Sequence, residues 1–413
     1  MWIILIIVIF ILSLYCTIII KGKNYKINLF EIIKNDKGGL LYSIGLKLGV
    51  GSVIGTLSSI IIGGISSIFW IIIFSFISSS LIYLECFLGK KYKQVSNNGN
   101  ISGPYYIVRY GLNNKFISII TLILFLILYS FLFQMIQINT ISIFLKNTLN
   151  ISDLCIIFFI IAIILLIITS SSNINNYIIK KLTIIKCILF FCICFYGIVV
   201  HFNELIMSIN NMELFNYKSI FSGLIIGVKR SIFMNEILIG TTSSCSCKDN
   251  NYNDLSCKYQ IVSMYIVTLL STLLISSLFL IYTNNNEMIF DYNKLLTNIF
   301  IYTSGKLGLF LLFITLVLFS ITTLLGGFDI LISNVSFITN NKVIINFVKL
   351  LFLIICLLGV VIDKNNLWKY SDFLIFIMLI INSYCIIKLS RKWLYDRKWL
   401  GYCFKKCLGK WWI

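Results

Sequence analysis

The chain has 413 residues, of which 59% are hydrophobic and only 12% are charged, and it contains a single proline. Soluble globular proteins are about 45–50% apolar and about 25% charged, so this composition excludes a soluble enzyme, a disordered chain and a collagen-like or coiled-coil protein. The formal net charge of +19 comes from basic residues that lie between long apolar runs, which is typical of membrane loops and not of a nucleic-acid-binding surface. The composition therefore predicts an all-α polytopic membrane protein.

Runs of about 20 mostly apolar residues are long enough to cross the hydrocarbon layer, and they cross it as helices. We identify eleven candidate spans, near residues 1–20, 40–62, 65–88, 116–145, 152–171, 182–202, 218–243, 260–282, 307–333, 343–362 and 370–390. The first run has no charged segment before it and no small-residue cleavage site, so we expect a retained helix and not a signal peptide.

The charges of the connecting loops predict the orientation. Basic residues are concentrated after the first, third and fifth spans and behind the last one, whereas the alternate loops contain acids such as Glu204 and Glu287. The positive-inside rule then places the N-terminus outside the plasma membrane and the C-terminus in the cytoplasm. The tail at 391–413 is basic and rich in tryptophan. It is either an interfacial segment on the anionic cytoplasmic leaflet or an ordinary cytoplasmic tail with anchoring tryptophans.

The cysteines and the histidine of this sequence do not form a pattern typical of disulfides, metal binding or catalysis. Most of the thirteen cysteines lie inside apolar runs, where Cys behaves as a small hydrophobic residue. Cys245, Cys247 and Cys257 lack a fourth ligand at zinc spacing, and the only histidine, His201, is distant in the sequence. We therefore expect neither a disulfide framework nor a structural metal centre, and without a catalytic Ser/His or Cys/His set we do not expect an enzyme.

Two of the spans are interrupted by glycines or polar residues. The second contains Gly45, Gly49, Gly51, Gly55, Gly63 and Gly64, and the seventh contains Gly223, Gly227, Lys229, Arg230, Asn235, Glu236 and Gly240. The two spans stand five apart, which is typical of inverted-repeat transporters with a midplane binding site. Glycines alone would also fit close helix packing, but charges inside a span usually mark a transport pathway.

This spacing predicts a single transmembrane transporter domain at 1–390. Its parts are an extra N-terminal helix at 1–21, a first five-helix repeat at 38–207 and a second five-helix repeat at 216–390, with the basic cytoplasmic tail at 391–413.

Motifs along these spans occur in the order of a known family. Residues 49–55, Gly-Val-Gly-Ser-Val-Ile-Gly, stand where the family has G-T-G-N-I-A-G, and residues 227–236 follow its G-V-K-R-G-L-F-S-N-E. Further matches in order are Gly63-Gly64 with Phe69-Trp70, Glu85 with Lys91-Tyr92, residues 103–106, 135–139 and 322–326, and Trp368, Asp372, Met378 and Asn382. The chain thus resembles the alanine/glycine:cation symporters (sodium:alanine symporters). The resemblance implies about 11 transmembrane helices in a LeuT-like five-plus-five inverted repeat with an extra N-terminal helix.

The resemblance also implies a function. It implies symport of a small neutral amino acid of the alanine and glycine class with Na⁺, by alternating access and without an organic cofactor. The residues that it places at the substrate are Gly49, Gly51, Ser52, Gln137, Asn139, Asn235 and Glu236. At the sodium ion it places Thr322, Thr323 and the backbone of Gly49, since a hard cation prefers oxygen ligands. For each Ser or Thr the alternative is a hydroxyl bonded to its own helix one turn back.

Several positions depart from the family pattern. Ser52 replaces an Asn, and Ile237 with Leu238 replaces Ala-Gly, which is expected to narrow the second break or reshape the pocket. Lys186 stands where the family has a proline. A buried lysine there could load and release a proton in place of sodium, and the alternative is a side chain that reaches the cytoplasmic interface. The sequence leaves open a sodium-coupled symporter, a proton-coupled permease that uses Lys186, and a non-transporting amino-acid sensor or scaffold.

Overall fold

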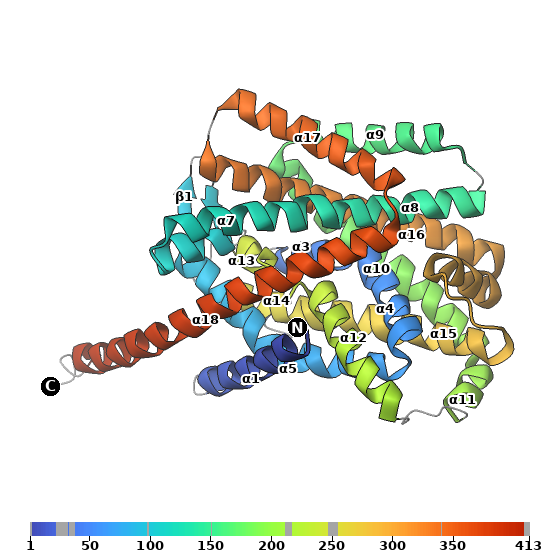
Figure 1. The fold of residues 1–413 in the computed structure, drawn as a ribbon, viewed down its shortest axis with the longest axis horizontal. Helices are drawn as coiled ribbons and strands as arrows, with labels where there is room; N and C mark the ends of the chain where they lie inside the picture. The colour runs from blue at the N-terminus through green and yellow to red at the C-terminus, as the bar shows by residue number, and fades with distance from the viewer. Residues whose placement is uncertain are drawn as a thin grey trace.

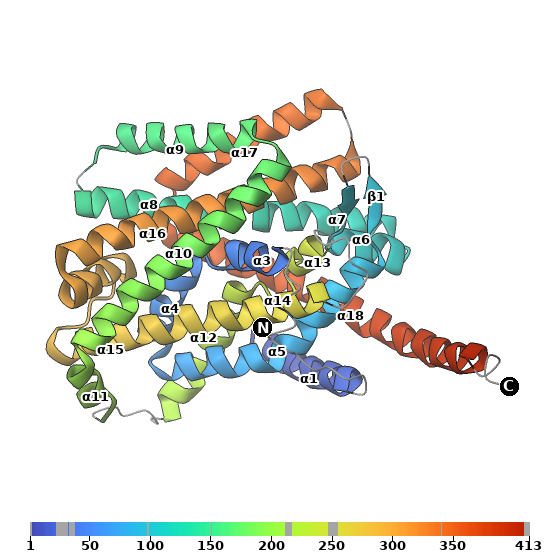
Figure 2. The same ribbon diagram turned by 180° about the vertical axis from the view of Figure 1, so that it is seen from behind.

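The computed structural model describes residues 2–21, 32, 38–96, 99–149, 151–210, 217–246, 255–339 and 341–408 of the chain. Nearly all of these residues are helical, and the helices pack into one bundle that Figure 1 shows from one side and Figure 2 from the other. The only strands in the described ranges, β1 (Gln94–Ser96) and β2 (Gly99–Ile101), form a short antiparallel hairpin that the sequence did not predict.

The elements follow one another with short connections. In the first half the helices are α1 (Trp2–Lys21), α3 (Gly39–Lys47), α4 (Val50–Gly63), α5 (Ser66–Lys91), α6 (Pro104–Tyr106), α7 (Lys115–Phe125), α8 (Phe133–Leu149), α9 (Asp153–Thr169), α10 (Ser172–Val200) and α11 (Phe202–Asn210). In the second half they are α12 (Tyr217–Asn235), α13 (Thr241–Cys245), α14 (Leu255–Thr268), α15 (Leu274–Asn285), α16 (Tyr292–Ile338), α17 (Lys342–Val361) and α18 (Lys364–Leu408). Wider π-helical turns occur at η1 (Ile107–Gly111), η2 (Leu126–Leu132) and η3 (Leu269–Leu273). The turn η2 joins α7 to α8, and η3 joins α14 to α15, so each pair forms one continuous long helix.

The lengths and compositions of these helices suit a membrane. Among the described residues, seven helical stretches are long and apolar enough to cross it, and the bent pair α3–α4 makes eight. The apolar stretches in α1 and α9 are shorter, at Trp2–Ile18 and Asp153–Thr169, and α12 carries the adjacent basic residues Lys229 and Arg230 in its interior. The count of eleven spans, the five-plus-five layout, the repeat boundaries and the orientation of the termini therefore stay predictions.

Several elements are longer than the apolar pattern suggested. Helix α10 starts at Ser172, well before the expected span at 182–202. Helix α16 starts at Tyr292 and is kinked at Gly305, so it includes a helical segment before the span predicted at 307–333. Helix α18 continues past the predicted end of the last span, and in Figure 1 its C-terminal part leaves the bundle. The side chains of this part and residues 409–413 lie outside the described residues, and so do both interpretations of the tail.

Two glycines of the seventh predicted span, Gly223 and Gly227, pack against α5 and do not break α12. The helix is continuous from Tyr217 to Asn235 and packs against α4 and α5. A Cβ atom on Gly223 would lie 2.1 Å from Ser66 Oγ, and one on Gly227 would lie 2.5 Å from the carbonyl oxygen of Ser67. The prediction that these two glycines interrupt the span is therefore wrong, because they permit close helix packing instead.

The helices are interrupted at two places, one within each of the two spans predicted to be broken. Helix α3 ends at Lys47 and α4 begins at Val50, with a bend of 47° between them. The second break lies between the end of α12 and the start of α13 at Thr241, where Glu236 and Leu238 have φ angles of 55° and 56°. This left-handed conformation is costly for residues other than glycine.

Side chains from distant helices stabilise the second break. The N–H of Leu238 donates to Oε2 of Glu85 on α5 at 3.0 Å, and its carbonyl oxygen accepts from Nδ2 of Asn382 on α18 at 2.6 Å. The Leu238 side chain is fully buried. Both backbone groups of this strained residue are therefore bonded, and its side chain contributes to the core.

Substitutions of Leu238 separate the strain from the burial. Removing a buried Leu side chain costs about 2–5 kcal/mol, so Leu238→Ala and Leu238→Gly should both lower the melting temperature in detergent micelles. Glycine also relieves a left-handed strain of roughly 1–2 kcal/mol, which alanine retains. We therefore expect Leu238→Gly to be the more stable of the two variants.

The matched control is Leu278 in α15, which is equally buried but helical. There glycine should be less stable than alanine by about 1 kcal/mol. Leu238→Gly melting at or below Leu238→Ala would show that position 238 is not strained.

Candidate functional site

A small cavity lies between the two breaks. Its lining comes from four parts of the chain: Leu46, Lys47, Gly49, Gly51 and Ser52 at the first break, Tyr129, Phe133, Gln134 and Gln137 on η2 and α8, Phe233, Met234 and Glu236 at the second break, and Thr323 on α16. The lining contains one basic and one acidic side chain among neutral polar and apolar groups.

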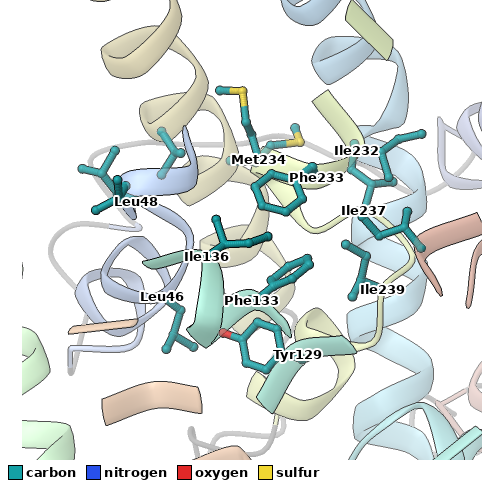
Figure 3. Close-up of a cluster of buried hydrophobic side chains, with 14 of the residues drawn as sticks. Leu46, Leu48, Tyr129, Phe133, Ile136, Ile232, Phe233, Met234, Ile237 and Ile239 are labelled. Atoms are coloured by element: carbon teal, nitrogen blue, oxygen red, sulfur yellow. The ribbon is translucent and has the colours of Figure 1, made fainter. Parts of the chain in front are cut away.

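Aromatic rings form the apolar part of the wall. Figure 3 shows Tyr129, Phe133 and Phe233 between Leu46 and Leu48 near the first break and isoleucines before and within the second, Ile232, Ile237 and Ile239. The ring centroids of Phe133 and Phe233 are 4.7 Å apart, and Phe233 lies at the same distance from Trp368 on α18. These rings exclude water from one side of the cavity.

A charged cluster lies behind Trp368. The guanidinium carbon of Arg230 lies 4.2 Å from the Trp368 ring centroid, and its Nη1 lies 3.7 Å from Oδ1 of Asp372. The other oxygen of Asp372 is 3.2 Å from Nζ of Lys229. The charges inside the seventh predicted span thus pair with an acid on α18.

The backbone of the first break approaches its neighbours closely. The N–H of Val50, at the start of α4, donates to Oε1 of Gln137 at 2.9 Å. A Cβ atom on Gly49 would lie 2.9 Å from both Nε2 of Gln137 and Cγ2 of Thr323. Glycine at position 49 therefore allows the amide of Gln137 to satisfy a helix N-terminus that would otherwise have an unpaired donor.

Lys186 lies directly against the first break. The side chain is fully buried, and its Nζ donates to the carbonyl oxygens of Gly45 and Leu48 at 2.9 and 2.6 Å and to Oγ1 of Thr322 at 2.6 Å. All three N–H donors of the ammonium group are used. This arrangement excludes the alternative in which Lys186 reaches the membrane interface.

Lys47 is a second buried lysine, at the end of α3. It is 5% exposed, and its Nζ donates to the carbonyl oxygen of Gln260 at 3.1 Å and to Oγ of Ser263 at 3.3 Å. Ser43, one helical turn earlier, also bonds Gln260 and Ser263 through its hydroxyl. These contacts attach α3 to α14.

The structure brings most of the predicted site residues to the cavity. Gly49, Gly51, Ser52, Gln137 and Glu236 line it, as does the predicted sodium ligand Thr323. The hydroxyls of Ser52 and Thr323 donate to carbonyl oxygens of their own helices, which is the alternative considered for them. Thr322 lies outside the cavity, and its hydroxyl accepts from Lys186 while donating to Phe319.

Two predicted substrate ligands lie elsewhere. The amide nitrogen of Asn139 donates to the carbonyl oxygens of Gly359 and Ile362 at the end of α17. The amide of Asn235 bonds Ser75 on α5 and Thr268 on α14 at 3.0 and 2.8 Å. Because these contacts hold both amides in the walls, the structure does not place Asn139 or Asn235 as substrate ligands.

Sequence analysis missed several lining residues. Tyr129, Phe133 and Gln134 lie one and two turns before Gln137, so the helical spacing of the known position could have indicated them. Lys47 was identifiable as a charge inside an apolar span, beside the glycines of the first break.

Comparison with known proteins identifies the family. The model of the Sodium:alanine symporter family matches residues 1–399. The chain belongs to the sodium:alanine symporter family. Membership makes it a multi-pass membrane transporter, as the sequence motifs predicted.

Individual relatives of this symporter are distant. It is 23% identical to the probable sodium/glutamine symporter GlnT of Bacillus subtilis, over 84% of this chain and 75% of that protein. It is 19% identical to the amino-acid carrier protein AlsT of the same organism, over 89% and 82%. A manganese transporter from Eremococcus coleocola matches with a TM-score of 0.45 and 13% identity, over 85% of this chain and 77% of that structure.

Gly49→Ala tests the close approach in the symporter's first break. The added methyl group would displace Gln137 and leave the Val50 N–H unpaired, which costs about 1–3 kcal/mol. We expect a lower melting temperature in micelles and weaker amino-acid binding.

Gly55→Ala is the matched control, because its Cβ would lie 3.6 Å from the nearest atom, in ordinary contact. As a mid-helix Gly-to-Ala change it should leave binding intact and raise stability by up to about 1 kcal/mol. Equal effects of the two substitutions would contradict the special role of Gly49.

Proposed function

We propose that the chain is a secondary active transporter that carries small neutral amino acids across the plasma membrane by alternating access. The observation that carries the proposal is the meeting of two helix breaks at one cavity that is lined by both a buried lysine and a buried glutamate. Transporter folds place their substrates at such discontinuities, where helix ends and unpaired backbone groups can bind charged groups. The printed names of the relatives, a sodium/glutamine symporter and an amino-acid carrier protein, agree with this substrate class.

The lining of the cavity favours a small neutral amino acid. Its walls offer an aromatic side beside the polar first break. A small neutral amino acid matches these walls, because its short apolar side chain can contact the aromatic rings and its charged amino and carboxylate groups can face the polar first break.

Sodium is the first candidate for the coupling ion. Family membership supports it, and Thr323 and Gly49 provide hydroxyl and backbone oxygens at the cavity. Hard cations take such oxygen ligands. Substrate and ion would then bind at the same break.

A proton is the second candidate, and the position of Lys186 favours it. Its ammonium group already donates to two carbonyl oxygens of the first break and to Thr322, which are groups that would otherwise be available to a bound cation. A lysine that alternates between charged and neutral forms can carry a proton, because deprotonation releases these bonds.

Ion-swap uptake into proteoliposomes distinguishes the candidates. Under sodium coupling, concentrative uptake of alanine or glycine should require an inward sodium gradient and disappear in potassium. Under proton coupling, uptake should follow an inward proton gradient without sodium, and Lys186→Met should abolish this response.

Lys181→Met is the control, because Lys181 lies on the same helix but is exposed. Lys181→Met should show the same uptake under each ion gradient as the unaltered chain. Amino-acid binding without flux under either gradient would contradict transport and favour a sensor or scaffold.

A further inference from the structure

Helix α1 contacts the charged cluster behind Trp368 through the ring of Trp2. The ammonium group of Lys229 lies 4.6 Å from the centroid of this ring, within the range of a cation–π interaction. The same ammonium group donates to Oδ2 of Asp372 on α18 at 3.2 Å. Trp2 also packs edge-on against Phe376 of α18, with ring centroids 5.5 Å apart. Trp2 therefore holds Lys229 against Asp372 where α1, α12 and α18 meet.

Lys229 and Arg230 share one carboxylate. Lys229 bonds Oδ2 of Asp372, whereas Nη1 of Arg230 lies 3.7 Å from Oδ1, which is beyond hydrogen-bond distance. The guanidinium group of Arg230 lies over Trp368 instead, with its carbon 4.2 Å from the ring centroid. Arg230 is 8% exposed, and its Nη1 has no hydrogen-bond partner in the part of the chain that the structure describes. A buried guanidinium gains most from a direct bond to a carboxylate, so Lys229 and Arg230 compete for Asp372.

The position of Arg230 is transmitted to the central cavity through aromatic rings. The Trp368 ring, which Arg230 covers, lies 4.7 Å from the ring of Phe233, a lining residue of the cavity. Phe233 in turn lies 4.7 Å from Phe133, which also lines the cavity. Because side chains in a close-packed interior have little room, a shift of one ring displaces its neighbours. A rearrangement at Asp372 therefore alters the aromatic wall of the cavity.

We propose that Trp2 is a positioning residue for the amino-acid site, and that α1 acts through it on the aromatic wall of the central cavity. The Trp2 ring keeps Lys229 on one oxygen of Asp372. The guanidinium group of Arg230 then stays on Trp368. Without the Trp2 ring, the partly exposed Lys229 leaves the carboxylate, and Arg230 bonds it instead of covering Trp368. This inference rests on the proposed function, since it concerns the site that is proposed to bind the amino acid.

The first test observes Trp368 itself. The full chain is labelled with fluorotryptophan and studied by fluorine NMR in detergent micelles, and Trp368→Phe assigns the Trp368 resonance. We expect Trp2→Leu to shift this resonance, because the guanidinium group leaves the ring. Trp2→Tyr should return it close to its original position, since tyrosine also offers a cation–π face.

Phe10→Leu is the matched control, because Phe10 is an aromatic residue of α1 that packs against Phe74 of α5. It should lower the melting temperature without shifting the Trp368 resonance. A Trp2 side chain with only a structural role would behave in the same way, and an unmoved resonance in Trp2→Leu overturns the inference.

Lys229→Met removes the same contact from the other side. It should shift the Trp368 resonance in the same direction, and Trp2→Leu should add nothing to this shift in the double variant. Should Trp2→Leu fail to fold, Lys229→Met decides alone, because an unmoved resonance in this variant also overturns the proposal.

The second test measures the amino-acid site. Trp2→Leu should raise the dissociation constant for L-alanine by about two- to fivefold, which is the range that a cation–π contact at a partly exposed site accounts for. In proteoliposomes it should raise KM by a similar factor while the maximal rate is retained, and Phe10→Leu should change neither constant. A shifted resonance without uptake under either ion gradient would contradict the proposed transport alone. Uptake with a KM that Trp2→Leu leaves unchanged would contradict this inference alone.

Discussion

Each helix break leaves peptide groups unpaired in a region where little water can bond them, and the structure depends on the side chains that do so instead. Buried backbone donors and acceptors are costly unless they are bonded. Lys186 bonds two carbonyl oxygens before the first break, Gln137 bonds the Val50 N–H after it, and Glu85 with Asn382 bonds both groups of Leu238 at the second. These side chains belong to α10, α8, α5 and α18, so the breaks also hold four long helices in register around the cavity.

The short helix α3 is the element that these contacts restrain most. Lys186 and Thr322 attach its C-terminal end to α10 and α16, and Ser43 and Lys47 attach it to α14. A movement of α3 that opens the cavity must break bonds to both lysines. Under the proposed function, a proton leaving Lys186 would therefore release one end of this nine-residue helix.

The sequence predicted the apolar spans well but placed the second break only approximately. Apolar run length is a property of each segment alone, and the structure has helices over all the predicted spans within the described residues. A glycine, in contrast, permits either unwinding or close packing, and its neighbours decide which. Gly49 adjoins the first break, whereas Gly223 and Gly227 pack against α5 in a continuous helix. The left-handed residues of the second break are Glu236, Leu238 and Gly240, and of these only Gly240 is of a type that favours this conformation.

Motifs predicted which residues lie near the cavity. They did not predict the role of a residue whose side chain is hydrogen-bonded to another helix. Gln137 and Asn139 lie two residues apart on α8, so their side chains point in different directions, and only Gln137 reaches the cavity. Thr322 and Lys186 were expected to serve different ions, yet their side chains share one hydrogen bond beside the first break. Since this contact joins α3, α10 and α16, which lie far apart in the sequence, no local pattern could reveal it. A sodium ion at Thr322 and a charged Lys186 would compete for the same hydroxyl oxygen, so under the proposed function the protonation of Lys186 governs which cation the break holds.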